Sequence, residues 1–288
     1  MFTFYEQDKK IFLVITMNDY YHENQALGFT DISNILHNPA VFKKPVVPTE
    51  EMNLGTIVHA KIFTPNSQVK YRLFAFKTGE QRTLAEKDAM EQGVLLITPQ
   101  TQETATAAIA ALQDFKNSLN TAGVSETPFY ATQDITTFDG RTETIQIKAK
   151  PDFYDPETKT LYDLKITAKS ICTPRERETF LVTGHYYMQL AHYKDVLEKN
   201  GYEVNRCVLV VVSYAHRGRF AANCGCYVGE LELDDDYIEY GLQKRNEALE
   251  MFIDMKNKTT KQLATIKTVI KKPNYFYLKG NDCAEMTI

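Results

Sequence analysis

The sequence has no apolar run long enough to cross a membrane. Even the apolar stretch 208–212 is far shorter than the roughly 20 residues that a transmembrane helix needs, and it fits a buried central strand. The first residues also lack the charged segment followed by an apolar segment that marks a signal peptide. We therefore expect no membrane segment and no export signal.

Cysteine is too sparse and too irregularly spaced to form a disulfide framework. The chain has 5 cysteines, a pattern that favours a reducing cytoplasm. Cys224 and Cys226 form one close pair, but no second pair lies at a spacing that would complete a zinc or iron–sulfur site. His185 and His192 do not have the His-x-x-x-His spacing of a zinc helix, and we expect them to be ordinary surface or core residues.

Internal repeats and low-complexity tracts are absent as well. With 288 residues and 43% hydrophobic content, the chain can bury one large core. We predict a lead-in over residues 1–25, with two short strands, one of them at 11–16, followed by a single α/β domain over 26–288. Helices are expected at 53–63, 80–90, 102–120, 183–200 and 234–256, with a loop at 170–180.

Residues 148–167 are the most informative part of the sequence. They predict a β-hairpin, with one strand at 145–154, a turn at Asp155-Pro156-Glu157 and a second strand at 160–166. Asp163 and Lys165 lie two residues apart, so they share one face of the second strand. If the register brings Asp152 beside them, two carboxylates and an ammonium group converge. Such a set is suited to Mg²⁺ and to metal-assisted hydrolysis of a phosphodiester.

Pro151-Asp152 followed by Asp163-x-Lys165 resembles the signature of PD-(D/E)XK nucleases. Two further segments resemble the RecE-type (exonuclease VIII-like) phage exonucleases and the RecB-like nuclease domains: Leu-Gly-Thr-Ile-Val-His at 54–59, and the Gln-x-x-x-Tyr of Gln189 and Tyr193. All three segments occur in the order found in that group. The resemblance implies a PD-(D/E)XK nuclease core, in which a mixed central β-sheet is flanked by helices, with a helical N-terminal portion and a catalytic core at about 123–215.

The same resemblance assigns roles around the proposed site. Asp152, Asp163 and His59 would hold Mg²⁺ or Mn²⁺, and Lys165 would position the attacking water. Gly55 would let the His59 helix approach the sheet closely. A glutamate is also expected near the metal, and Glu126 and Glu143 both compete for that position, with Glu126 slightly preferred.

Gln189 and Tyr193 lie four residues apart on one helical face, where they either pack in the core or line a DNA channel. A net charge of -4 means that DNA binding has to rely on local basic clusters. One such cluster follows the second strand and includes Lys169, Arg175 and Arg177. Another has six lysines over residues 256–272. The acidic segment 230–239 would face away from DNA or lie at a subunit contact.

The activity implied by the resemblance is exonucleolytic hydrolysis of linear double-stranded DNA, from 5′ to 3′, in phage-type recombination. Its implied partners are a single-strand annealing protein and further copies of the chain, in the cytoplasm of a bacterium or of a phage-infected host. Three alternatives stay open. The chain could be a nuclease of the same fold that acts on single strands or as an endonuclease. It could also be a DNA-binding or phage assembly protein without activity, or an unrelated protein that matches by chance.

Overall fold

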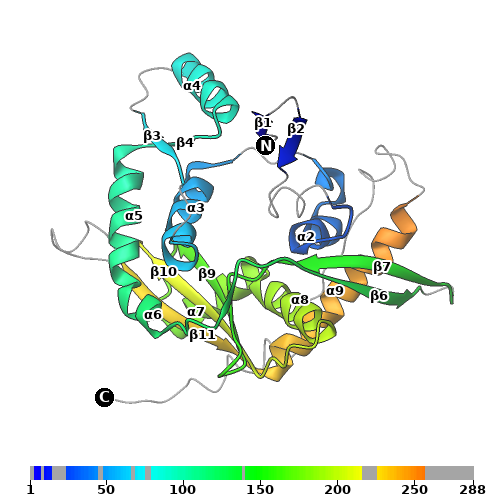
Figure 1. Ribbon diagram of the computed structural model, residues 1–288. Helices are drawn as coiled ribbons and strands as arrows, with labels where there is room; N and C mark the ends of the chain where they lie inside the picture. The colour runs from blue at the N-terminus through cyan, green and yellow to red at the C-terminus, as the bar shows by residue number, and fades with distance from the viewer. Residues whose placement is uncertain are drawn as a thin grey trace, which may run out of the picture.

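The structure is a computed structural model that describes residues 3–7, 10–14, 24–44, 48–65, 69–74, 79–137, 140–215 and 226–256. Its centre is a five-stranded mixed sheet in the order β11-β10-β9-β8-β5 (Figure 1). The strands are β5 (Val124–Ser125), β8 (Phe153–Asp155), β9 (Thr160–Thr167), β10 (Arg206–Ser213) and β11 (Tyr227–Leu233). β9 and β10 are parallel, and the other pairs in this sheet are antiparallel.

The strand β10 shows why the sheet is covered on both faces. Seven of its eight residues are buried, as expected for a parallel strand that is packed on two sides. Leu209 and Val211 contribute to one hydrophobic core, and Val208 and Val210 contribute to the other. This alternation follows from the two-residue repeat of a strand. The buried central strand that was expected from the run at 208–212 therefore forms.

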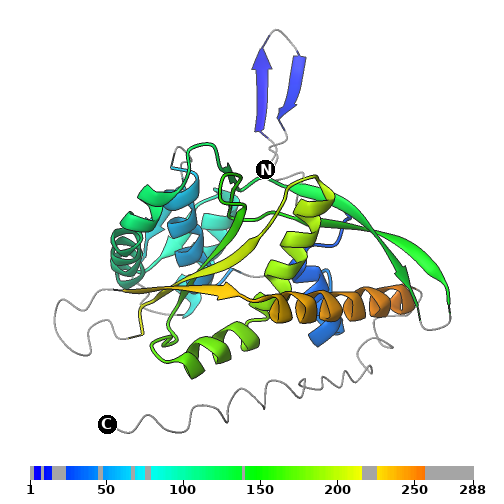
Figure 2. The same cartoon turned by 90° about the horizontal axis from the view of Figure 1, so that it is seen from below.

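Helices fill the two layers on either side of the sheet (Figures 1 and 2). One layer contains α3 (Glu50–Phe63), α5 (Pro99–Ala111) and α6 (Gln113–Ser118). The other contains α2 (Phe29–His37), α7 (Pro174–Thr183), α8 (Tyr186–Lys199) and α9 (Asp235–Met255). The buried residue Arg245 of α9 forms an ion pair of 2.5 Å with Asp195 of α8, which joins the two longest helices of the second layer.

A two-stranded ribbon, β6 (Phe129–Thr136) and β7 (Thr142–Ala149), extends from the sheet alongside α9 (Figure 2). Ion pairs join its far end to the end of α9, including Lys256 with Glu143 at 2.5 Å. The remaining elements are the 3-10 helix η1 (Pro39–Val41), the pair β3 (Tyr71–Leu73) and β4 (Leu95–Ile97), and α4 (Gly79–Glu91). The N-terminal strands β1 (Thr3–Gln7) and β2 (Lys10–Val14) pair with each other.

The structure corrects four sequence-based expectations. The strand predicted at 145–154 is two strands, because β7 pairs with β6 whereas β8 pairs with β9. The helix predicted at 102–120 is divided at Leu112 into α5 and α6. The loop predicted at 170–180 contains most of α7, which begins with a capping box between Thr173 and Glu176. Gly55 does not allow a close approach of α3 to the sheet, since a Cβ atom there would meet nothing within 4 Å.

Two further expectations concern residues that the structure does not describe. Of the six lysines at 256–272, the structure describes only Lys256, and Cys224 also lies outside the described residues. Among the described helices, none combines the length and the apolar character that crossing a bilayer requires.

Candidate active site

The candidate site lies at an edge of β9 that its neighbour β8 leaves uncovered. β8 pairs with β9 only from Asp155↔Thr160 to Phe153↔Tyr162. One step further along this register, Asp152 lies opposite Asp163. Asp152 Oδ2 accepts the backbone N–H of Leu164 at 2.6 Å, and His59 Nε2 lies 2.9 Å from the Leu164 carbonyl oxygen. Side chains therefore satisfy the backbone groups that a continued β8 would have paired.

His59 reaches this edge from α3. The helix begins at the N-cap residue Thr49, has acidic residues in its first turn, and buries the predicted apolar stripe of Leu54, Val58 and Ile62. Nε2 of His59 faces a carbonyl oxygen and therefore carries a hydrogen atom. Its Nδ1 faces the carboxylates, 3.3 Å from Asp152 Oδ1 and 3.8 Å from Glu126 Oε1. Without its proton, this nitrogen would present a lone pair to a metal ion.

Glu126 lies beside His59, whereas Glu143 does not. Glu126 has a left-handed backbone with φ of 48°, which is uncommon for this residue type, and its N–H bonds the Asp152 carbonyl at 3.2 Å. This geometry turns its carboxylate toward the site. Glu143 lies on the β6–β7 ribbon, where it pairs with Lys256. Of the two glutamates that sequence reasoning left open, the structure brings only Glu126 to the cluster.

His59, Glu126 and Asp152 form a set of side chains whose ligand atoms all lie within 4.8 Å of one another. Two carboxylates and one imidazole nitrogen suit a divalent cation that accepts oxygen ligands and tolerates nitrogen. Asp163 is outside this three-residue set. Its Oδ2 is 2.6 Å from Lys165 Nζ, and its Oδ1 accepts from Gln189 at 3.2 Å. Asp163 and Lys165 share one face of β9, as predicted.

The chain matches the family described as PDDEXK-like domain of unknown function (DUF3799) over residues 40–265. It belongs to this family. The match and the mixed sheet flanked by helices confirm the predicted fold class and the PD-(D/E)XK part of the resemblance. The narrower RecE-type assignment stays a prediction.

The chain is similar to several solved structures, to different degrees. A proposed exonuclease from Eubacterium rectale is 14% identical, with a TM-score of 0.52, over 93% of this chain and 99% of that one. A phage-related exonuclease from Haemophilus somnus is 12% identical, with a TM-score of 0.34, over 83% of this chain and 97% of that one. An alkaline exonuclease from Laribacter hongkongensis is 17% identical, with a TM-score of 0.28, over 73% of this chain and 90% of that one. No curated protein matches the sequence.

The charges in this PDDEXK-like site shift one another's pKa values. Burial by itself lowers the pKa of His59, but the charge and close contact of Asp152, together with the nearby carboxylate of Glu126, raise it to about 10. Burial raises the pKa of Asp163 to about 6, against the opposing charge of Lys165. For Asp152, burial favours a higher pKa, but His59 and Lys165 hold it below its ordinary value. Near neutral pH, His59 is therefore an imidazolium that balances the carboxylates.

Gln189 and Tyr193 are packed against the rest of the protein. Both are 8% exposed, which fits packing in the core, the first of the two roles considered above, and their role in DNA binding stays a prediction. Gln189 Nε2 donates to Asp163 Oδ1 and to the Tyr193 hydroxyl, at 3.2 and 2.9 Å. The pair thus fixes the Asp163 carboxylate from beneath the site. The two residues do share a face of α8, as their i, i+4 spacing predicts, but that face packs on β9.

The predicted basic residues lie beyond the C-terminal end of β9. Lys169 and Arg175 are exposed. Arg177 is half-buried, and its guanidinium donates to the carbonyl oxygens of Ile171 and Cys172. Lys169 and Arg175 are therefore available to a polyanion, whereas Arg177 contributes to holding the loop before α7.

Sequence reasoning assigned no role to two residues that contact the cluster. Lys150 Nζ is 2.7 Å from Glu126 Oε2. In the sequence, only its position two residues before Asp152 indicated that it would lie near the site. Tyr186 places its ring 5.3 Å from Lys165 Nζ, a cation–π distance. His185, whose φ is 55°, precedes it as the N-cap of α8. The expectation of an ordinary residue holds for His192, which is fully buried.

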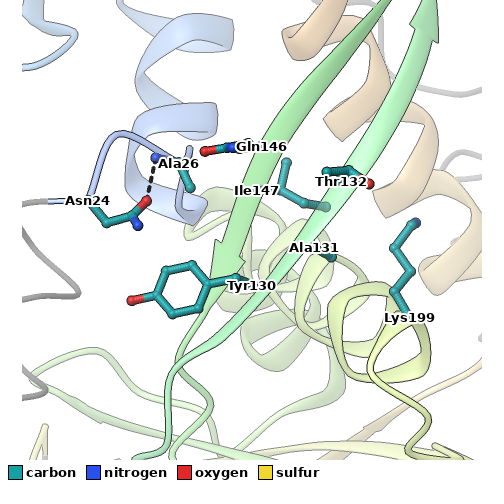
Figure 3. A pocket seen from close by; sticks show the side chains of 8 residues that line it. All are labelled: Asn24, Ala26, Tyr130, Ala131, Thr132, Gln146, Ile147 and Lys199. Atoms are coloured by element: carbon teal, nitrogen blue, oxygen red, sulfur yellow. Dashed lines mark hydrogen bonds between the residues drawn. The ribbon is translucent and has the colours of Figure 1, made fainter.

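A separate cavity of about 740 Å³ lies on the β6–β7 ribbon (Figure 3). Asn24 and Ala26 lie on one side of the ribbon, and Lys199, at the end of α8, lies on the other. The remaining lining residues are Tyr130, Ala131, Thr132, Gln146 and Ile147. Among the described residues, the lining has no carboxylate and none of the candidate site residues.

Proposed function

We propose that this protein is a metal-dependent exodeoxyribonuclease that hydrolyses linear double-stranded DNA. The observation that supports this proposal best is the convergence of His59, Glu126 and Asp152 beside the Asp163–Lys165 pair at the open edge of β9. The family match indicates a nuclease fold, and a fold hosts a given chemistry only through its site. Carboxylates, an imidazole and a lysine at one edge suit metal-assisted hydrolysis of a phosphodiester.

In the proposed mechanism, His59 Nδ1, Glu126 and Asp152 would hold the cation, and Asp163 on β9 would assist them. When bound, Mg²⁺ or Mn²⁺ supplies Lewis-acid activation of the phosphate and of a bound water. Lys165 orients the attacking water, and its ammonium group is kept in place by Asp163 and by the Tyr186 ring. Gln189 holds Asp163 in turn. No covalent intermediate with the protein is involved.

The biological setting that we propose follows the RecE-type resemblance. The enzyme would degrade DNA from 5′ to 3′ and leave a 3′ single strand for an annealing protein in phage-type recombination. It would act in the cytoplasm of a bacterium or of a phage-infected cell, as a homo-oligomer that encloses its substrate. Lys169 and Arg175, which are exposed beyond β9, would contact phosphates on the way to the site.

The test uses linear duplex DNA labelled at either the 5′ or the 3′ end, together with a closed circular duplex. Wild type and Asp163→Ala are compared with Mg²⁺, with Mn²⁺ and with chelator. We expect mononucleotide release from the 5′ label first, an intact circle, and no product from Asp163→Ala or without metal.

Each of the other outcomes would indicate a different activity for this protein. Cutting of the circle would show an endonuclease on the same fold. Degradation of single strands alone would overturn the choice of substrate, and early release from the 3′ label would overturn the polarity. Absence of hydrolysis with every divalent metal would favour a DNA-binding or phage assembly protein that has kept the fold.

A further inference from the structure

The open edge of β9 continues beyond the residues of the candidate site. On this strand, Thr167 directs its carbonyl oxygen toward β10, where it accepts from Tyr214. Leu164 directs its backbone groups to the opposite edge, toward Asp152 and His59. Because backbone groups alternate along a strand, Ile166 also directs its N–H and C=O to that edge. Within the described residues, the pairing of β8 with β9 stops at Phe153, so no strand covers Ile166 there.

Helix α3 runs antiparallel to β9 along this edge. Near the helix N-terminus, Glu51 and Leu54 share a small cavity with Tyr214, which follows the C-terminal end of β10. Near the helix C-terminus, the ring of Phe63 lies 6.3 Å from that of Phe153, which pairs with Tyr162. His59 is bonded to Leu164. One helical turn before His59, Gly55 shares the His59 face of α3 and is displaced in the direction in which β9 continues from Leu164 to Ile166.

Gly55 leaves this position open. A Cβ atom there would meet nothing within 4 Å, so no packing contact requires glycine. The backbone is helical, so no unusual φ angle requires it either. Glycine inside a helix is destabilising relative to alanine. The free space on the His59 face of α3 therefore points to something that occupies it during function.

We propose that the nucleic-acid strand passes between Gly55 of α3 and the edge of β9, and that a phosphate oxygen accepts the Ile166 N–H. This inference rests on the proposed function and specifies where the strand next to the scissile phosphate lies. The argument for the occupant is continuity: Ile166 is two residues from Leu164, roughly 6.6 Å along the strand, and Leu164 contacts both Asp152 and His59. An unpaired N–H at that position suits an anionic oxygen.

The first experiment fills the space beside Gly55 with a larger side chain. Gly55→Leu and Gly55→Ala are compared with Thr56→Leu, an exposed neighbour on another face of the same helix. Binding of a short duplex with a 5′ phosphate is measured by fluorescence anisotropy in Ca²⁺, and the length of the DNA is checked afterwards. Mn²⁺ affinity and thermal unfolding show whether the metal site and the fold are intact.

We expect Gly55→Leu to weaken DNA binding about tenfold or more, the loss associated with one hydrogen bond to a charged group. Gly55→Ala should have a smaller effect and Thr56→Leu none. Mn²⁺ affinity should be kept in all three variants, and the melting temperature should not fall. The second experiment removes the backbone donor. Ile166→Pro should weaken DNA binding by about the same factor as Gly55→Leu, whereas Ile166→Val, which keeps the N–H, should bind DNA as the wild type does.

The results separate this inference from the proposed function. Wild type that binds DNA without cleaving it would overturn the activity alone. Equal DNA binding by wild type, Gly55→Leu and Ile166→Pro would overturn the inference alone. A Gly55→Leu protein that loses Mn²⁺ binding as well would show that Gly55 supports the metal site, which also contradicts the proposal. Should Gly55→Leu not fold, Gly55→Ala and Ile166→Pro still decide between these outcomes.

Discussion

Two histidines of this protein make the same anchoring contact in opposite surroundings. His59 Nε2 lies 2.9 Å from the Leu164 carbonyl oxygen, and His192 Nε2 lies 2.9 Å from the Lys148 carbonyl oxygen. Nδ1 of His59 faces two carboxylates, whereas Nδ1 of His192 has no hydrogen-bond partner in the described part of the chain. The pKa of His59 rises to about 10, while burial and the charge of Arg245 lower that of His192 to about 4.

This difference shows how a candidate metal ligand is recognised in this fold. Burial and a fixed ring orientation are common to both histidines, so neither property by itself indicates function. The carboxylates in front of the second nitrogen distinguish His59, because a cation can replace the proton that it shares with them. Around His192 the largest effect of a nearby charge comes from the cation Arg245, and the charges of Asp195 and Lys199 have smaller, opposite effects.

The largest expected effect comes from removing the charge that makes the two histidines differ. Asp152→Asn should abolish DNA cleavage, by about 10³-fold or more, because both a ligand and the partner of His59 are lost. Histidine NMR titration should show the pKa of His59 moving down, toward that of His192. Cleavage at the wild-type rate, or an unchanged pKa for His59, would contradict the site as described.

Lys165→Ala is expected to lose cleavage by about 10²- to 10⁴-fold, the range for removing a group that handles the attacking water. Mn²⁺ and DNA binding should be largely kept, since Lys165 is not a ligand. Asp163→Ala, the matched variant of its partner, should lose Mn²⁺ binding as well as cleavage. Equal Mn²⁺ affinity in the two variants would leave Asp163 without a role at the metal.

Metal binding should depend on pH through His59. Without a metal ion, Nδ1 of His59 keeps its proton up to about pH 10, and this proton must leave when the cation binds. Mn²⁺ affinity should therefore increase about tenfold per pH unit between about pH 7 and pH 8.5. Calorimetry in buffers of different ionisation enthalpy should detect about one proton released per metal ion. A pH-independent affinity would show that His59 keeps its proton and is not a ligand.

His192 should make the fold sensitive to acid. Its pKa is 6.5 in the unfolded chain and about 4 in the fold, so below about pH 6.5 only the unfolded state takes up the proton. The free energy of unfolding should be unaffected above that pH. It should fall by up to about 3 kcal/mol as the pH approaches 4, and then level off.

The measurement for His192 is urea unfolding across this pH range, for wild type and for His192→Gln. Glutamine keeps a donor for the Lys148 carbonyl oxygen but cannot take up a proton. The wild-type loss should therefore exceed that of the variant. Parallel pH profiles for the two proteins would show that His192 does not hold the assigned proton state.

The smallest effect separates the two glutamates. Glu126→Gln should weaken Mn²⁺ binding about tenfold or more, as expected for loss of a charged group at the metal. Glu143→Gln should leave Mn²⁺ affinity unchanged and alter the free energy of unfolding by less than about 1 kcal/mol, because its pair with Lys256 is exposed to solvent. A similar loss of Mn²⁺ affinity in both variants would remove Glu126 from the proposed ligand set.

Local sequence patterns predicted the parts of this protein that depend on neighbouring residues. The apolar stripe of α3 and the shared face of Asp163 and Lys165 both follow from the repeat of a helix or of a strand. The end of α8 is also local, since Asn200 caps it and Gly201 adopts a φ of 85°. The three motif segments, taken in their order along the chain, were enough to indicate the nuclease fold.

Features that depend on pairing between distant segments were not predicted. The predicted strand 145–154 divides because β7 finds its partner in β6 and β8 finds its partner in β9, and both partners are rich in strand-forming residues. The sequence left open whether Gln189 and Tyr193 pack in the core, because their burial depends on the face of α8 that packs on β9. α7 was missed because its residues have little amphipathic pattern, although its capping box was present in the sequence.

The sequence by itself determined which side chains can do chemistry here: two aspartates, a lysine, a histidine and a glutamate in the order of a nuclease family. Only the tertiary structure decided which glutamate joins them and what Gln189 supports. It also decided that β8 begins only after Asp152 and leaves an edge of β9 open. The physical reason is that spacing along a chain fixes faces, whereas hydrogen-bond partners and pKa values depend on which segments meet in space.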